Sequence, residues 1–380
     1  MQITAAVFRD DTLRPSIETL TLSGPRAGEV LVRIVAAGVC HTDMKSGGPG
    51  SPVPRPVVLG HEGAGVVEAV GEGVTKVVPG DHVVMTFGSC GHCRSCQEAE
   101  PAYCWHQFPL TFACTRPDGS HYLEARDGTP VHGDFFSQSS FASHAIGRER
   151  NVVKVRKDAP LELLGPLGCG VQTGAGAILN DFRMKPGQTL AIFGVGALGL
   201  SAVMAARIAG AGRIVVVDRH AHRLALAMEL GADVAIAAGT APVTEEVMEA
   251  VPGGVDFALD TTGVLPVMRQ AMDVLAPRGN CGFVTSPWDG SEMPISVRNL
   301  LLGRKVRGII EGNSNPDVFI PQLIDFYMDG RFPFDRLVTF YPFNEIARAF
   351  HDSETGVTVK PVLRVQALDG APPSPDALRQ

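Results

Sequence analysis

The sequence predicts an α/β protein in which a doubly wound parallel sheet is joined to a β-rich domain. Short apolar runs alternate with Ala- and Leu-rich segments from about residue 170 to 310, a pattern typical of βαβ units. Earlier in the chain, short apolar runs are broken by Gly, Pro and Asp, a pattern typical of strands and turns. A length of 380 residues suits two or three domains.

In the first part of the chain, residues 30–35 and 65–70 are predicted strands, and residues 86–140 are irregular and polar. The later part is predicted to contain the strands 190–193, 214–218, 255–260 and 280–284, with helices at 198–209 and 222–230. After residue 310 we predict helices at 319–328 and 343–350, a strand at 360–365, and a loosely ordered tail over 366–380.

Composition argues against nucleic-acid and membrane binding. The net charge is −7 and there is no strong basic run. An uncharged stretch at 186–206 is interrupted by glycines, so it predicts a strand, a turn and a helix rather than a membrane span. No signal peptide is visible at residues 1–9, and four of the eight cysteines have metal-site spacing, so we expect a cytoplasmic protein.

A dinucleotide-binding fingerprint lies between a predicted strand and a predicted helix. Gly194, Gly196 and Gly199 form G-x-G-x-x-G, and Asp218 ends the next predicted strand. The glycines permit a tight turn, close approach of backbone to a pyrophosphate, and close helix–strand packing. The helix N-terminus would face the phosphates.

The cofactor predicted from this motif is NAD. Asp218 would accept hydrogen bonds from the adenosine ribose and repel a 2′-phosphate. Arg219 follows directly and weakens that preference, and Arg223 is a further expected cofactor contact.

Four cysteines, Cys90, Cys93, Cys96 and Cys104, have the spacing C-x2-C-x2-C-x7-C. Four thiolates so close in sequence can bind one tetrahedral zinc ion with no open position, which is a structural site. An iron–sulfur cluster would use similar ligands, and free or disulfide-paired cysteines are the remaining alternative.

Cys40, His61 and Cys169 form a second, dispersed group, each flanked by glycine or polar residues. Two thiolates and one imidazole would leave a zinc ion one open position, as catalytic sites require. No spacing rule shows that these three residues meet, because each alone is more often a core or surface residue.

The sequence resembles the zinc-containing medium-chain alcohol dehydrogenases over nearly its whole length. Gly60-His61-Glu62, then Gly65, Gly71 and Val74, match the zinc signature of that family, and the spacing of the four cysteines matches its structural-zinc lobe. Within the family, three segments look most like bacterial aryl (benzyl) alcohol dehydrogenases: 170–177, 308–312 and 357–363.

The resemblance implies a division of the chain into three parts. Residues 1–170 would form a GroES-like catalytic domain with a structural-zinc lobe at 88–106. Residues 171–310 would form the Rossmann NAD-binding domain, and residues 311–380 would return to the catalytic domain and end in a flexible tail.

The resemblance also implies roles for individual residues. Cys40, His61 and Cys169 would be ligands of a catalytic zinc, with Asp43 orienting His61 and Glu62 behind the ligands. Thr42 occupies the position of the family's proton-relay hydroxyl. The expected contacts with the cofactor are His41 near the phosphates, Thr173 at the nicotinamide and Lys360 at the pyrophosphate.

One departure from the family concerns proton release. Many members have a histidine where this chain has Lys45, and lysine is a poor proton acceptor unless its pKa is depressed. The proton could instead leave through the ribose and water. Roles for Cys114 and Cys281 are not readable, and burial as small hydrophobic residues is the default.

The implied activity is oxidation of a primary, benzyl-type alcohol by hydride transfer from a zinc-bound alkoxide to NAD, and the reverse reaction. The alternatives are a terpenoid, aliphatic or glutathione-adduct alcohol dehydrogenase and an inactive NAD-binding relative. Aromatic residues that could line the substrate pocket, or simply pack, are Phe87, Trp105, Phe108 and Phe112. The family suggests a homodimer or homotetramer, and 300–310 is a candidate sheet edge for pairing.

Overall fold

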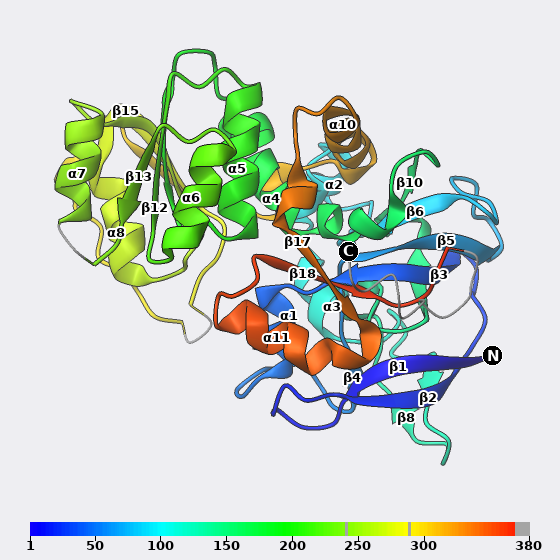
Figure 1. Ribbon diagram of the computed structural model, residues 1–380. Coiled ribbons are helices and arrows are strands. Elements are labelled where there is room, and N and C mark those ends of the chain that lie inside the picture. Colours follow the sequence, from blue (N-terminus) through cyan, green and yellow to red (C-terminus); the bar gives the residue numbers. More distant parts are fainter. Residues whose placement is uncertain (240–241, 288–289, 369–380) are drawn as a thin grey trace. The chain divides into compact units, whose positions relative to one another are not determined.

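A computed structural model describes residues 1–239, 242–287 and 290–368 (Figure 1). The chain forms two compact units. The first comprises Met1–Cys169, Asn315–Asp325 and the chain from Val338 onward, and the second comprises Gly170–Ser314 and Phe326–Leu337. Each unit has its own sheets and its own hydrophobic core.

The first unit contains two sheets. The smaller has the order β4 (Val57–Val58), β1 (Gln2–Phe8), β2 (Ser16–Leu22), β7 (Leu123–Glu124), β8 (Pro130–Val131). The larger has the order β10 (Val152–Val155), β6 (His82–Met85), β5 (Gly63–Val70), β3 (Glu29–Gly38), β18 (Lys360–Arg364), β17 (Val338–Pro342), with β9 (His144–Arg148) also paired to β3. Helices of this unit are α1 (His41–Gly47), α2 (Arg94–Gln97), α3 (Gln107–Phe112) and α11 (Ile346–Glu354), and α10 (Pro316–Met328) begins in it.

Strand β3 organises the larger sheet. Nine of its ten residues are buried, because β5, β9 and β18 all pair with it in antiparallel register. Its run Val30–Ala37 is apolar apart from the partly exposed Arg33, as expected of a strand that is buried on both faces. The chain leaves β3 directly before Cys40, while β5 begins directly after His61 and Glu62. The end of β3 and the start of β5 thus determine the positions of Cys40, His61 and Glu62.

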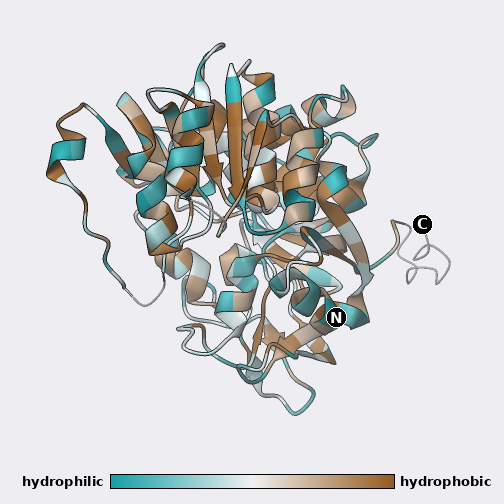
Figure 2. Cartoon of the chain, turned by 60° about the vertical axis from the view of Figure 1, so that its left-hand side comes forward, coloured by the Kyte–Doolittle hydropathy of each residue, from teal (hydrophilic) through white to brown (hydrophobic). Residues whose placement is uncertain are grey.

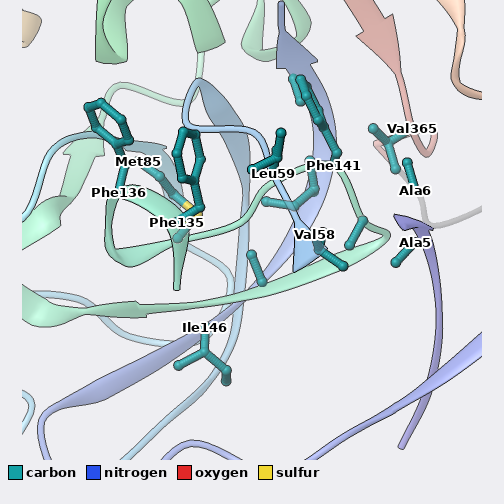
Figure 3. Close-up of a cluster of buried hydrophobic side chains, with 14 of the residues drawn as sticks. Ala5, Ala6, Val58, Leu59, Met85, Phe135, Phe136, Phe141, Ile146 and Val365 are labelled. Carbon is teal, nitrogen blue, oxygen red and sulfur yellow. The ribbon is translucent and has the colours of Figure 1, made fainter. Parts of the chain in front are cut away.

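Apolar side chains fill the space between these strands and the loops that follow them. Figure 3 shows part of this core, where Phe135 and Phe136 lie side by side and Met85, Leu59 and Phe141 continue the cluster. Several of these residues come from the predicted irregular stretch 86–140, so that stretch contributes to the core as well as to loops.

The second unit is built on a six-stranded, wholly parallel sheet. Its order is β13 (Val234–Ala237), β12 (Arg213–Asp218), β11 (Thr189–Phe193), β14 (Val255–Asp260), β15 (Leu275–Phe283), β16 (Lys305–Gly308). The helices of this unit are α4 (Gly170–Gly176), α5 (Ala197–Ile208), α6 (Ala221–Glu229), α7 (Val243–Ala250), α8 (Leu265–Asp273) and α9 (Val297–Leu300).

The strand order of this sheet reverses at β11. Strands β12 and β13 extend the sheet on one side of β11, and β14, β15 and β16 extend it on the other. Ligands of such doubly wound sheets bind at the carboxyl ends of the strands beside the reversal point. Figure 2 shows most of these strands in the colour of hydrophobic residues, as expected for a sheet covered on both faces. The predicted fold class is confirmed.

The two units differ in detail from the three predicted segments. The second unit extends from Gly170 to Ser314 rather than from 171 to 310, and residues 326–337 also belong to it. Arg336 of this segment forms an exposed ion pair with Glu229 of α6. Most of the predicted loose tail, from residue 369, lies outside the described residues. Among the described residues, no helix is long and apolar enough to cross a membrane.

Gly199 offers a test of the close packing between β11 and α5. A Cβ atom at Gly199 would lie 2.0 Å from the carbonyl oxygen of Gly194, a backbone atom that cannot move aside as a flexible side chain can. We expect Gly199→Ala to lower the free energy of unfolding by at least about 1–3 kcal/mol, the usual cost of overpacking. Denaturant-induced unfolding measures this loss.

The matched control is Gly308→Ala in β16, where a Cβ atom would meet nothing within 4 Å. Equal stability losses for the two variants would contradict the packing argument.

Candidate active site and cofactor site

The structure brings Cys40, His61 and Cys169 together in the first unit. Their ligand atoms, with a carboxylate oxygen of Glu62, all lie within 4.8 Å of one another. All four residues are buried. Cys40 immediately precedes α1, His61 and Glu62 lead into β5, and Cys169 ends the short helical turns 165–168. Residues far apart in the chain therefore form one polar cluster inside a hydrophobic unit.

Asp43 fixes the orientation of the His61 ring. One carboxylate oxygen, Oδ1, lies 2.9 Å from Nδ1 of His61 and accepts the backbone N–H of Gly60 at 3.0 Å. The other oxygen accepts the N–H of Cys40 at 3.0 Å, so Asp43 connects two of the clustered residues. Burial opposes protonation of His61, but the charge and hydrogen bond of Asp43 raise the pKa of the imidazole well above its usual range. Nε2 is the ring nitrogen left to face the cluster.

Cys40 favours the thiolate form. The hydrogen bond between its thiol and Cys169, assisted by His61, lowers the pKa of the Cys40 thiol well below its usual range, although burial opposes the shift. Thiolates are the form in which cysteine binds metals. The hydroxyl of Thr42 lies 3.8 Å from Sγ of Cys40, in the first turn of α1.

Glu62 and Lys360 form a buried ion pair behind the cluster. Nζ of Lys360 donates to the Glu62 carboxylate at 2.8 Å and to the carbonyl of Val39 at 3.1 Å. Burial raises the pKa of Glu62 to about 6, while the charge of Lys360 opposes that rise. A Cβ atom at Gly38 would lie 2.1 Å from Glu62 Oε2, so only glycine at that position admits the carboxylate.

The donor set fits a zinc ion. Nε2 of His61 is buried and has no hydrogen-bond partner among the described residues, which is costly for a polar atom unless something else binds it. Two sulfurs and one imidazole nitrogen are the ligands of an open zinc site. A buried cation would also neutralise the thiolates, which burial otherwise disfavours.

Aromatic rings cover one side of His61. The Phe136 ring stacks on the imidazole at a centroid distance of 4.2 Å, and Phe135 meets its edge at 5.5 Å. Phe112 continues this wall, at 5.9 Å from Phe136 and 5.2 Å from the exposed Phe108. Of the aromatic residues predicted near the substrate, Phe112 contacts a ring that stacks on His61, and Phe108 contacts Phe112. Trp105 is 69% exposed.

Phe135 and Phe136 are not among the predicted site residues. Phe136 has a left-handed backbone conformation, with φ of 52°, which no periodic pattern indicates. Two adjacent phenylalanines in an otherwise polar stretch were the available signal. Phe87, by contrast, lines a separate cavity of about 280 Å³ with Thr75, Lys76 and Arg150.

The four closely spaced cysteines also converge. Their sulfur atoms lie within 4.8 Å of one another, with 3.9 Å between Cys90 and Cys96 and 4.0 Å between Cys93 and Cys104. A tetrahedron with Zn–S bonds of about 2.3 Å has edges of about 3.8 Å. Backbone N–H groups of Cys90, Cys93, Trp105 and His106 point at these sulfurs. All four cysteines are free, so the geometry suits a metal rather than disulfides.

In the second unit, the glycine loop has the form that a dinucleotide requires. Gly194 has a φ of 89°, and Gly196 is the N-cap of α5. At Gly196 a Cβ atom would meet only Nη1 of Arg223, at 3.9 Å. An anion could therefore approach this loop between the N-terminus of α5 and a guanidinium.

Asp218 ends β12 beside this loop. Its carboxylate accepts the N–H of Val195 at 2.7 Å and the N–H of His220 at 2.8 Å. Arg223 is half-buried, and its Nε has no hydrogen-bond partner among the described residues. Burial lowers the pKa of Arg223, and the charge of Asp218 opposes that shift. The side chain of Arg219 contacts the His220 ring.

The remaining predicted cofactor residues lie in different surroundings. Thr173, in α4, is buried with its hydroxyl 3.4 Å from the Glu311 carboxylate. His41 is exposed at the start of α1. Partial burial lowers the pKa of Lys45, near the end of α1, as a role in proton release would require. The ammonium of Lys360 contacts Glu62, so its predicted contact with a pyrophosphate stays a prediction.

Comparisons with known proteins identify the family. Residues 26–157 match the family described as the alcohol dehydrogenase GroES-like domain, and residues 197–328 match the zinc-binding dehydrogenase family. The geraniol dehydrogenase of Castellaniella defragrans is 48% identical over 362 residues, which cover 94% of this chain and 96% of that protein. This chain belongs to the zinc-containing medium-chain alcohol dehydrogenases.

Solved structures of this alcohol dehydrogenase family have the same fold. A crystal structure described as an alcohol dehydrogenase zinc-binding domain protein from Burkholderia ambifaria has a TM-score of 0.94 at 52% identity, covering 96% of this chain and 99% of that one. Benzyl alcohol dehydrogenase from Acinetobacter calcoaceticus has a TM-score of 0.93 at 43% identity, with the same coverage of 96% and 99%. The predicted family is confirmed.

The two cysteine clusters make separable predictions. We expect about two zinc ions per chain by elemental analysis, and about one in each of the variants Cys169→Ala and Cys96→Ala. Cys96→Ala should also lower the melting temperature. The residues around the four cysteines form only short helices, so a zinc ion bound by all four sulfurs would stabilise this part of the chain.

Cys169→Ala should lower the melting temperature less than Cys96→Ala does, because the four-sulfur site stays intact and only the buried cluster loses its ion. A Cys169→Ala protein that still holds two zinc ions would show that Cys169 is not a ligand.

Proposed function

We propose that this protein is an NAD-dependent zinc alcohol dehydrogenase of the aryl type, which converts primary, benzyl-type alcohols to aldehydes and back. The observation that carries the proposal is the buried cluster of Cys40, His61 and Cys169, with Nε2 of His61 facing it. Those three residues would hold the catalytic zinc, which supplies a Lewis acid for the alcohol or carbonyl oxygen. The four-cysteine site would hold the second zinc.

The chain's own groups would orient the reactants and move the proton. Asp43 holds the His61 ring through Nδ1. Thr42 Oγ1, beside Cys40, would accept the proton of the alcohol and pass it outward. Lys45, one turn further along α1, is the proposed next acceptor, and its partial burial lowers its pKa in the direction that this role requires.

NAD is the proposed cofactor. It would lie at the glycine loop, with its pyrophosphate at the N-terminus of α5 and its ribose at Asp218. The buried carboxylate would repel a 2′-phosphate, while Arg219 and Arg223 add positive charge nearby. Thr173 would contact the nicotinamide. His41 and Lys360 remain proposed contacts of the phosphates.

The names of two relatives support the substrate class. Benzyl alcohol and geraniol are both primary alcohols in which an unsaturated carbon carries the CH₂OH group. The Phe136 ring stacks on His61 and the Phe112 ring lies against Phe136, which gives the site an apolar aromatic side that suits either alcohol. A terpenoid alcohol is therefore the second candidate, favoured by 48% identity to a geraniol dehydrogenase.

We propose a homodimer or homotetramer for the assembly. Strand β16 is an edge strand of the parallel sheet, and the nearby Val297, Leu301 and Leu302 are exposed apolar residues. A cytoplasmic location suits a chain in which none of the eight cysteines forms a disulfide.

A substrate panel tests the proposed function. With NAD, we expect kcat/KM for benzyl alcohol and geraniol to exceed that for ethanol by about a hundredfold or more, because the larger alcohols bury more apolar surface. The ratio between benzyl alcohol and geraniol decides between the two candidates. Turnover of none of the three alcohols with either cofactor would refute the proposal.

Asp218 gives a test of cofactor choice. Asp218→Asn removes the charge but keeps the size, so we expect the preference for NAD over NADP to fall about tenfold to a hundredfold, measured as a ratio of kcat/KM values. The control is Asp256→Asn, because Asp256 also accepts a backbone N–H, from Thr189 at 2.8 Å, but lies at the start of β14. An unaltered preference in Asp218→Asn would count against the assigned role.

A further inference from the structure

One buried amide side chain connects the chain segments that carry the clustered ligands. Gln138 is fully buried in the first unit. Its Nε2 donates to the carbonyl oxygens of His61 at 2.9 Å and Thr86 at 3.1 Å. Its Oε1 accepts the N–H of Gly63 at 3.2 Å. Gln138 thus holds the backbone on both sides of Glu62.

A second hydrogen bond extends this connection to Cys169. The hydroxyl of Thr86 donates to the carbonyl oxygen of Gly168 at 2.7 Å, and Gly168 directly precedes Cys169. Thr86 is fully buried and follows β6, which ends at Met85. Hydrogen bonds therefore run from the backbone of His61 through Gln138 and Thr86 to the residue before Cys169.

The segment that carries Gln138 is held in an unusual conformation. Residues with positive φ are Asp134 (63°), Phe136 (52°), Ser137 (60°) and Ser139 (58°). Such conformations cost about 1–3 kcal/mol each and persist only where the surroundings enforce them. The Ser139 hydroxyl enforces this one by accepting the N–H of Phe135 at 2.9 Å and donating to the Val58 carbonyl at 2.7 Å.

This conformation directs two neighbouring side chains to the same histidine. Phe136 stacks on the imidazole of His61, while Gln138 holds its carbonyl oxygen. An apolar side chain could fill the space of Gln138 without the cost of burying an amide. Packing alone therefore does not explain why a glutamine occupies this position. Its three polar contacts match three backbone groups beside the cluster.

We propose that Gln138 is a positioning residue of the Cys40–His61–Cys169 site, which fixes the backbone of His61 and, through Thr86, that of Cys169, and thereby sets how firmly the site retains zinc. The inference rests on the proposed zinc-dependent function. Residues that support metal ligands commonly change metal affinity about tenfold to a hundredfold when they are replaced.

The test is the rate at which the intact protein loses zinc to a chromophoric chelator. Gln138→Met has similar length but makes none of the three hydrogen bonds. We expect one zinc per chain to leave about tenfold to a hundredfold faster than from the unsubstituted protein. The zinc that remains should be bound by four sulfurs, as X-ray absorption reports.

Asn151 provides the matched control. It is an equally buried amide that donates to the carbonyl oxygens of Thr86 at 3.1 Å and Ser137 at 3.0 Å and accepts the N–H of Arg148 at 2.7 Å. It shares the Thr86 contact with Gln138 but does not hold the His61 carbonyl, so Asn151→Leu should lower stability by a similar amount while it accelerates zinc release clearly less than Gln138→Met does. Equal acceleration in both variants would reduce Gln138 to an ordinary core residue.

Thr86→Val keeps the proposal testable if Gln138→Met fails to fold, because it removes only the hydroxyl bonded to Gly168. It too should release one zinc faster. An active two-zinc protein whose Gln138→Met or Thr86→Val variant releases zinc at the normal rate overturns this inference alone. A protein that binds no zinc at Cys40, His61 and Cys169 overturns the proposed function as well.

Discussion

The main physical constraint on the first unit is the burial of two thiols and an imidazole inside a hydrophobic core, where charged groups are poorly solvated. Buried thiolates are costly unless a positive charge accompanies them. Asp43 orients His61 but leaves Nε2 facing the cluster, and Lys360 is engaged by Glu62. A zinc ion at this position would satisfy the sulfurs and the nitrogen together. The strand ends, the strained 134–139 segment and the buried polar side chains all serve to bring these atoms to one place.

The two units form their binding sites in different ways. In the second unit, a glycine loop and the N-terminus of α5 expose backbone N–H groups for an anion, and Asp218 ends the neighbouring strand. In the first unit, side chains from distant segments meet at a point, which requires a network of hydrogen bonds between loops. Parallel strands position the first kind of site, whereas antiparallel strand ends and irregular segments position the second.

These differences explain how much could be predicted from sequence. The strands and helices around the glycine loop were predictable because strand, turn and helix are contiguous, and observed β14 matches its predicted range 255–260. The four cysteines were predictable as a group for the same reason. The meeting of Cys40, His61 and Cys169 was inferred only from family resemblance, since no local pattern connects them. Phe136 and Gln138 were missed because left-handed backbone conformations redirect side chains without leaving a periodic signal.

Anomalous X-ray diffraction at the zinc absorption edge tests the central claim most directly. The account predicts two peaks per chain, one among the four sulfurs of the 90–104 lobe and one bonded to Sγ of Cys40, Sγ of Cys169 and Nε2 of His61. A single peak, confined to the four-cysteine lobe of a crystal grown with zinc in excess, would contradict it.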